Sequence, residues 1–307
     1  MTFTHRRRLA TGLLSVLSLS ACAGGSTPIS TSSTAAVRAP SPSPSTAAGG
    51  HVRGWIIGGS TLADLRAHDP SGVVTRTLDS PTTFVVVGGS GDFPQGWKAI
   101  PTQSFTRSEN LVDAVNGGKL AKGVQAVLLD IERWTLTPPE DQNDPAAAYA
   151  KAYAAARAHD LKLVATPGVD LAAPTAKREH EDAWRAYLDD LQLPSKIAPY
   201  ADVFEVQSQS QEQSRDRFSQ LLGGAEAQVH TRNPKASVFG GVSTNPNGSS
   251  VTAAQMADAV GAAAHHGIAG YWLNDPRHSQ ACGKCTGPFP AMAVEFLVML
   301  DTGAIPE

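Results

Sequence analysis

Eight short apolar runs constrain the fold of this chain more than any other feature of its sequence. They cover residues 54–57, 83–87, 98–101, 124–130, 161–165, 203–206, 237–240 and 268–272. The runs are rich in β-forming residues and apolar on both faces, which is typical of strands buried in a parallel sheet. Helical segments separate most of them, so the sequence predicts a (β/α)8 barrel. A doubly wound open sheet is the alternative, but Gly58-Gly59-Ser60 is too short for its phosphate-binding turn.

Two of the intervening segments carry clear helix-start signals. Asp144 precedes Pro145, which predicts an N-cap followed by proline in the first turn of a helix over 146–159. Thr252 and Gln255 have the spacing of a capping box, which predicts another helix start.

A third helix is expected over residues 175–192. Trp184, Leu188 and Leu191 recur there at helical spacing. We therefore expect Trp184 and Tyr187 to pack in the core and to have no functional role.

The N-terminus has the three zones of a bacterial secretion signal. Arg6–Arg8 are basic, residues 9–19 are apolar, and Leu19-Ser20-Ala21-Cys22 resembles a lipobox. The resemblance implies a signal peptide over 1–21 and a diacylglycerol on Cys22, so we expect an exported protein anchored by lipid to the outer face of the cell membrane. Plain secretory cleavage near Ala21 is the alternative, and both the general and the twin-arginine export routes remain open.

Composition then divides the mature chain. Residues 22–50 consist almost entirely of Ala, Gly, Ser, Thr and Pro, which predicts a flexible linker after the lipidated cysteine. Residues 51–307 suit one barrel-sized domain, which we expect to be monomeric. The net charge of −3 and the absence of a basic stripe argue against a nucleic-acid partner.

Cys282 and Cys285 form the remaining pair of cysteines, spaced C-G-K-C. In an exported chain such a pair favours a local disulfide. A thioredoxin-type redox site would need a strand-to-helix setting, whereas this pair lies in a polar segment. A metal site would need two more ligands, and only His278 is close in sequence.

The fourth run ends with two acidic residues at positions where a barrel carries its chemistry. Side chains alternate along a strand, so Asp130 and Glu132 share a face with Leu128, and Leu129 and Ile131 share the other. The two carboxyl groups are expected in the barrel mouth, where mutual repulsion raises one pKa and makes a proton donor. Structural roles in binding backbone amides or an arginine are the alternative.

Polar and aromatic residues at other strand ends complete the expected site. Trp272 and Asn274 share a face of the eighth run, and Trp272 offers a flat platform for a sugar ring or, alternatively, packs in the core. Inward-facing polar side chains must be hydrogen-bonded or functional. The remaining candidates for substrate binding are Trp134, Asp170, Glu205, Gln207, Gln209 and Asn245.

Other catalytic classes lack their motifs. The chain has no G-x-S-x-G nucleophile turn and no H-E-x-x-H zinc motif. We expect neither a cofactor nor a metal.

Two segments resemble family 18 glycoside hydrolases, which are chitinases and endo-acetylglucosaminidases with a (β/α)8 barrel. Residues 127–132 are similar to the final half of the D-x-x-D-x-D-x-E signature, and residues 270–275 to the last strand, which ends in a tryptophan. The resemblance implies that Glu132 protonates the leaving oxygen, that Asp130 orients a substrate acetamide acting as nucleophile, and that Trp272 forms the floor of the subsite. Gln125 and Leu128 occupy the positions of the two earlier aspartates.

The sequence therefore predicts a glycoside-hydrolase-like domain acting on a cell-wall or extracellular glycan, with Glu132 as general acid. The alternative is a sugar-binding surface lipoprotein without turnover. An arginine bound to Glu132 would favour this alternative, since a general acid must be free. The motifs leave the glycan, its linkage and the stereochemical outcome open.

Overall fold

The computed structural model describes residues 52, 54–88, 93–279 and 282–304. The predicted signal peptide (1–21), Cys22 and the linker (22–50) lie outside the described residues. None of the described helices is long and apolar enough to cross a bilayer.

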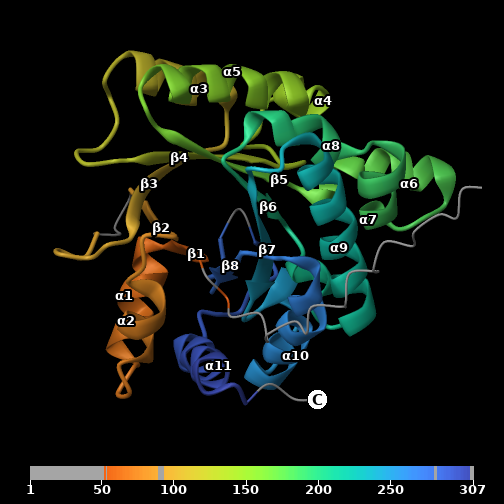
Figure 1. Cartoon of the computed structure of the whole chain (residues 1–307). Coiled ribbons are helices and arrows are strands. Elements are labelled where there is room, and N and C mark those ends of the chain that lie inside the picture. Colours follow the sequence, from red (N-terminus) through yellow and green to blue (C-terminus); the bar gives the residue numbers. More distant parts are fainter. Residues whose placement is uncertain (1–51, 53, 89–92, 280–281, 305–307) are drawn as a thin grey trace, which may run out of the picture. The chain divides into compact units, whose positions relative to one another are not determined.

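Eight parallel strands close into a barrel in sequence order, with β1 paired to both β2 and β8 (Figure 1). Gly54 pairs with Gly270 where the barrel closes. The strands are β1 Gly54–Gly58, β2 Thr83–Val87, β3 Ile100–Phe105, β4 Ala126–Ile131, β5 Lys162–Pro167, β6 Val203–Val206, β7 Ser237–Ser243 and β8 Gly270–Asn274. The predicted (β/α)8 TIM-type barrel is confirmed, and the open sheet is excluded because no strand forms an edge.

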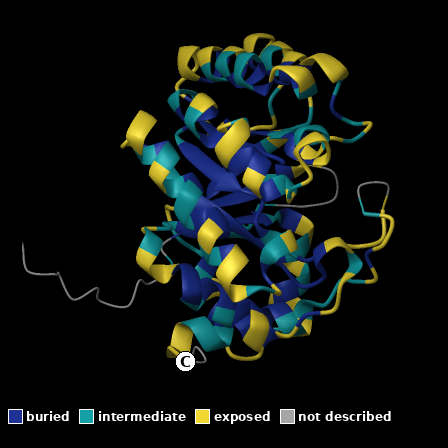
Figure 2. Cartoon of the chain, turned by 90° about the vertical axis from the view of Figure 1, so that its right-hand side faces the viewer, coloured by how far each residue is buried: buried dark blue, intermediate teal, exposed yellow. Residues whose placement is uncertain are grey.

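Helices surround the strands and follow each of them except β2, within the described residues. The α-helices are α1 Gly59–Ala67, α2 Val73–Leu78, α3 Ser108–Asn116, α4 Pro139–Asn143, α5 Pro145–Ala158, α6 Ala173–Glu179, α7 Ala183–Arg185, α8 Leu193–Ile197, α9 Arg215–Arg232, α10 Ala253–Ala263 and α11 Pro290–Thr302. Short 3-10 turns cover Val169–Ala172, Ala198–Tyr200, Gln209–Gln211, Pro246–Gly248 and Ala264–His266, and a π turn covers Ala186–Asp190. The outward faces of the helices are exposed, and the strands between them are buried (Figure 2).

The two predicted helix starts are confirmed. The Asp144 side chain accepts a hydrogen bond from Ala147 N at 3.1 Å and caps α5. Thr252 and Gln255 form both bonds of a capping box at the start of α10. These caps satisfy N–H groups that the first turn of a helix leaves unpaired.

Two sequence predictions about elements are wrong. The expected helix over 175–192 is broken after α6, because His180 adopts a left-handed conformation with φ 58°. Trp184 nevertheless lies in the core, as expected, with 6% of its surface exposed. The third strand starts at Ile100 and runs to Phe105, four residues past the predicted end at residue 101.

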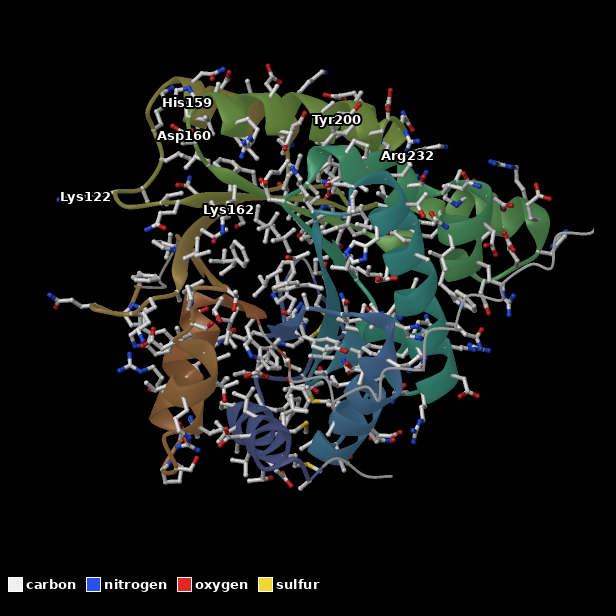
Figure 3. All side chains as sticks on the ribbon, in the orientation of Figure 1. Lys122, His159, Asp160, Lys162, Tyr200 and Arg232 are labelled. Carbon is white, nitrogen blue, oxygen red and sulfur yellow. A yellow bond between two sulfur atoms is a disulfide. The ribbon has the colours of Figure 1, made fainter. Side chains whose placement is uncertain are left out.

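The barrel interior is filled by a cluster of buried side chains from β1 to β7. They are Ile56, Phe84, Ile100, Ala126, Leu128, Val164, Val203 and Phe239, with Trp272 packed against them. At the end where the strands begin, the Lys162 ammonium lies 5.9 Å from the Phe84 ring centroid (Figure 3). A cavity lies at the opposite end of the barrel, where the strands finish.

Candidate functional site

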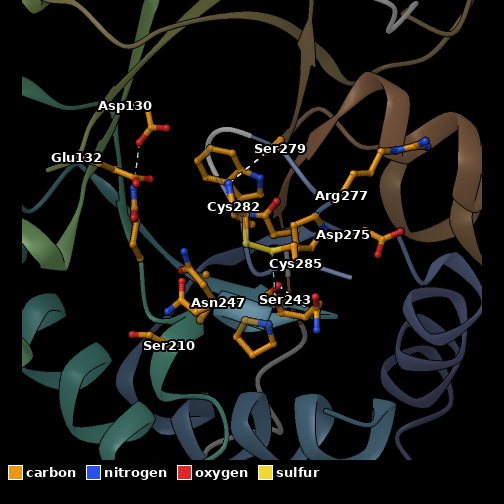
Figure 4. A pocket seen from close by; sticks show the side chains of 18 of the residues that line it. Asp130, Glu132, Ser210, Ser243, Asn247, Asp275, Arg277, Ser279, Cys282 and Cys285 are labelled. Carbon is orange, nitrogen blue, oxygen red and sulfur yellow. Dashed lines mark hydrogen bonds between the residues drawn. A yellow bond between two sulfur atoms is a disulfide. The ribbon is translucent and has the colours of Figure 1, made fainter. Parts of the chain in front are cut away.

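A cavity of about 500 Å³ lies at the end of the barrel where the strands finish (Figure 4). Its lining residues come from β4, β6, β7 and β8, from the segments that follow β4 to β8, and from the start of α1. All ten side chains that the sequence predicts for catalysis or binding line it: Asp130, Glu132, Trp134, Asp170, Glu205, Gln207, Gln209, Asn245, Trp272 and Asn274. The structure thus brings the predicted residues together in one place.

Strand alternation positions the two acidic residues of β4 as the sequence predicts. Leu128 packs in the barrel interior, whereas Leu129 and Ile131 pack in the outer layer beneath the helices. The side chains of Asp130 and Glu132 therefore point to the inner side of the barrel and reach the cavity.

Asp130 is held by one residue of the neighbouring strand β5 and by one residue that follows β6. Its Oδ1 accepts hydrogen bonds from Thr166 Oγ1 at 3.1 Å and from Gln207 Nε2 at 2.9 Å. Burial and the negative charge of Glu132 raise the pKa of Asp130 well above its usual range, and these hydrogen bonds oppose the rise.

Glu132 has the electrostatic character of a proton donor. Burial and the negative charge of Asp170 raise the pKa of Glu132 to about 7, while a hydrogen bond from Gln207 lowers it. A Cβ at residue 168 would lie 3.0 Å from Glu132 Cγ and closer still to Asp170 Oδ1. Glycine at this position therefore allows the two acidic segments to approach each other.

Asp170 is bound to backbone and faces the same cavity. Both of its oxygens accept hydrogen bonds from Arg133 N, at 3.1 and 3.0 Å. Burial raises its pKa, and the contacts with Arg133 lower it. The backbone N–H of Arg133 thus orients the Asp170 side chain. Among the described residues, Arg133 forms no salt bridge with Glu132.

Two tryptophans contribute aromatic surface to the cavity. Trp134 donates from Nε1 to Thr137 Oγ1 at 2.7 Å, and Thr137 also accepts from Glu132 N, so the ring is fixed relative to Glu132. Trp272 packs partly against the barrel interior and partly lines the cavity. Trp272 therefore packs in the core and also presents part of its surface to the cavity, while its role as a sugar platform stays a prediction.

The polar side chains on β6 and directly after it differ in whether they have hydrogen-bond partners. Gln207 uses its Nε2 donors on Asp130 and on Thr166 O, at 2.9 and 3.3 Å. In contrast, Glu205 Oε2 and Gln209 Oε1 are buried without a hydrogen-bond partner. Burial raises the pKa of Glu205 well above its usual range, and the charges of Asp130 and Glu132 raise it further.

Asn245 lines the cavity but is engaged in holding a loop. Its Nδ2 donates to Ser249 O and its Oδ1 accepts from Thr286 N, both at 2.8 Å. In the loop that contains Thr286, Cys282 and Cys285 form the expected disulfide, with Cα atoms 5.4 Å apart. Both cysteines line the cavity. The disulfide lies in the loop after β8, so the setting differs from the strand-to-helix setting of a thioredoxin site.

Sequence reasoning missed several lining residues from a helix start and from the loop after β8. Ser60 and Thr61 come from the first turn of α1, and Asp275, Arg277 and Ser279 follow β8. Ser60 comes three residues after the first apolar run, and this position near a strand end could have indicated it. Arg277 pairs with Asp64 of α1 and lies across the cavity from Asp130 and Glu132 (Figure 4).

The carboxyl groups lie around the cavity and do not converge on one point. Among the described residues, no three His, Cys, Asp or Glu side chains come together closely enough to hold a metal ion. The arrangement instead suits an organic ligand whose polar groups reach separate walls of the cavity.

Comparisons with known proteins add little to the barrel topology. No family model matches the sequence, and no curated protein matches it. Similar solved structures include triosephosphate isomerase from Bartonella henselae, with 10% identity, a TM-score of 0.43 and coverage of 82% of this chain and 100% of that chain. The N-terminal domain of a putative aldolase from Bacteroides vulgatus has 10% identity, a TM-score of 0.45 and coverage of 82% and 80%. It is the strand order and parallel pairing of this chain that define it as a TIM-type barrel.

Proposed function

We propose that this barrel is a glycoside-hydrolase-like protein in which Glu132 acts as general acid on a cell-wall or extracellular glycan. The observation that carries the proposal is the pKa of Glu132, which burial and the charge of Asp170 raise to about 7. About half of such groups are protonated at neutral pH, so Glu132 can donate a proton to a leaving oxygen.

The availability of Glu132 supports catalysis over binding alone. Within the described part of the chain, no Lys, Arg or His forms an ion pair with Glu132. An arginine bound to Glu132 would hold it ionised and would favour a sugar-binding protein without turnover.

Asp130 is the second acidic group of the proposed mechanism. Its hydrogen bonds from Thr166 and Gln207 hold its carboxyl group beside Glu132. A fixed carboxyl group there can orient the substrate beside Glu132.

The proposal includes the location of the protein. The N-terminal sequence supports export and lipid attachment at Cys22, which would place the barrel on the outer side of the membrane, near cell-wall glycans.

The test is a screen of purified protein against chitin oligomers, chitosan oligomers, peptidoglycan fragments and common glycans, with product detection by mass spectrometry. Cleavage of at least one glycan supports the proposal. Binding of a glycan without cleavage would replace it with the sugar-binding function.

A further inference from the structure

We propose that the wall of the cavity formed by Glu205 and Gln209 binds a protonated amine, so that the ligand is a glycan with free amino groups. The inference deepens the proposed function and rests on it in taking a glycan as the ligand. It concerns one acidic wall of the cavity, whereas the rim of the cavity carries the basic side chain of Arg277.

The first observation is a pair of unsatisfied acceptors. Glu205 is 1% exposed and lines the cavity, yet its Oε2 has no hydrogen-bond partner, and the same is true of Gln209 Oε1. Buried polar atoms without partners are rare because each costs free energy in the empty protein. The pair therefore indicates a ligand that brings hydrogen-bond donors.

The second observation is that these two side chains meet at a glycine. A Cβ at Gly241 would lie 2.9 Å from Glu205 Oε1 and closer still to Gln209 Oε1. Any larger residue at this position would push the two side chains away from each other. The backbone thus leaves space for two acceptors side by side on the cavity wall.

The third observation is the charge around the cavity. Four acidic side chains line it on β4, β5 and β6 or directly after these strands: Asp130, Glu132, Asp170 and Glu205. Arg277 is the one basic side chain among the described lining residues. It pairs with Asp64 of α1 and lies across the cavity from Asp130 and Glu132. Burial raises the pKa of the four acidic groups in the empty cavity and a bound cation lowers it again, so the walls favour a cation and disfavour uronic acids or phosphates.

Both N–H donors of Gln207 are already used, and the acidic character of the wall distinguishes an amine from an acetamide. Gln207 donates to Asp130 and Thr166, and Asn245 donates to Ser249. An acetamide brings a carbonyl acceptor together with one donor, whereas an ammonium brings three donors and a positive charge. The free acceptors of Glu205 and Gln209 match the ammonium better.

A metal ion is the other cation to consider, and the geometry disfavours it. Within the residues that the structure describes, no three carboxylate, imidazole or thiol groups converge on one point. A sugar-borne amine needs only the two acceptors on this wall, since the sugar ring fills the rest of the space beside Trp272.

The experiment measures binding of two matched tetramers to the full chain in detergent at pH 7. One is β-1,4-linked glucosamine and the other its N-acetylated form, and the fluorescence of the cavity tryptophans reports binding within seconds of mixing. We expect the amine form to bind about 10-fold to 100-fold more tightly, as for a charge-assisted hydrogen bond. Equal binding, tighter binding of the N-acetylated form, or no binding of either overturns the proposal.

Variants locate the effect. A bound ammonium favours the ionised form of Glu205, so Glu205→Gln keeps the shape, removes this charge from the complex and should lower the preference for the amine about 10-fold or more. Glu212→Gln is the matched control, because Glu212 is also a buried carboxyl group with a free oxygen but does not line the cavity. If Glu205→Gln does not fold, Gln209→Leu tests the same wall. An unchanged preference in the folded variant contradicts the proposal.

The outcome is separable from that of the proposed function. If the N-acetylated tetramer is cleaved through Glu132 but the amine form binds no better, this inference fails and the proposed function stands. If the amine form binds through Glu205 and no glycan is cleaved, this inference stands and the proposed function fails.

Discussion

Gln207 Nε2 lies 2.9 Å from Asp130 Oδ1, so an amide that follows the sixth strand reaches a carboxyl group on the fourth. The two residues are separated by 77 positions in the sequence. Gln207 also lowers the pKa of Glu132. One amide thus stabilises the ionised forms of two neighbouring acids.

Replacing Gln207 by Leu should raise the pKa of Glu132 above its value of about 7. The lost hydrogen bond favoured the ionised form, and its removal should shift the titration midpoint upwards by about one pH unit. Carbon-13 NMR titration of labelled glutamate carboxyl groups measures this midpoint. Gln213→Leu, an exposed glutamine on the same loop, is the control. An unchanged or lower midpoint for Glu132 would show that Gln207 has no such influence.

Glu132 should make the stability of the folded protein depend on pH. Its pKa in the folded state, about 7, is higher than the value of 4.5 for a free glutamate, so the folded state holds the proton more tightly. The stabilisation is present below pH 4.5 and is lost as the pH rises through 7. The loss is at most about 3 kcal/mol, reduced by the partial exposure of the side chain.

Glu132→Gln should remove this contribution. Urea unfolding at pH 5 and pH 8 should show that the variant gains stability relative to wild type at the higher pH. Glu295→Gln on the exposed face of α11 serves as the control. A difference between variant and wild type that is the same at both pH values would contradict the raised pKa.

Trp272→Ala should weaken ligand binding more than it slows chemistry. The indole lines the cavity and offers apolar surface, but it has no proton to transfer to a leaving group. We expect KM to rise about 10-fold, as for the loss of one stacking contact, with a smaller change in kcat. Trp97→Ala, outside the cavity lining, controls for general destabilisation. A fall in kcat with KM unchanged would assign Trp272 another role.

Cys22→Ala should release the protein from the membrane fraction. Cys22 is the proposed site of lipid attachment, and none of the described helices can span a bilayer. Cell fractionation and detergent partitioning measure the change, with Cys282→Ser as a cysteine substitution that should leave partitioning intact. Unchanged partitioning of the Cys22 variant would rule out the anchor.

Local sequence patterns were sufficient for the barrel and for one wall of the site. Strand alternation placed Asp130 and Glu132 on the inner side, because Leu129 and Ile131 match the apolar outer layer. Cap signals located the starts of α5 and α10, because capping depends on residues within one turn. Each of these features is decided within a few positions of the chain.

Features that depend on distant residues could not be predicted in this way. The bond between Gln207 and Asp130 has no periodic signal, and the pairing of Arg277 with Asp64 joins the last loop to the first helix. The break after α6 depends on His180 adopting a left-handed backbone, which is uncommon for residues other than glycine. Tertiary packing, rather than local propensity, decides these positions.

The turnover of Glu132→Gln tests the central claim most directly. The measurement is kcat/KM on whichever glycan the wild-type protein cleaves, with circular dichroism to show that the variant is folded. We expect a loss of about 10²–10⁴-fold, because glutamine keeps the shape of the side chain and lacks the proton that general acid catalysis transfers. A folded Glu132→Gln protein that cleaves the glycan as fast as wild type would show that Glu132 is not the general acid.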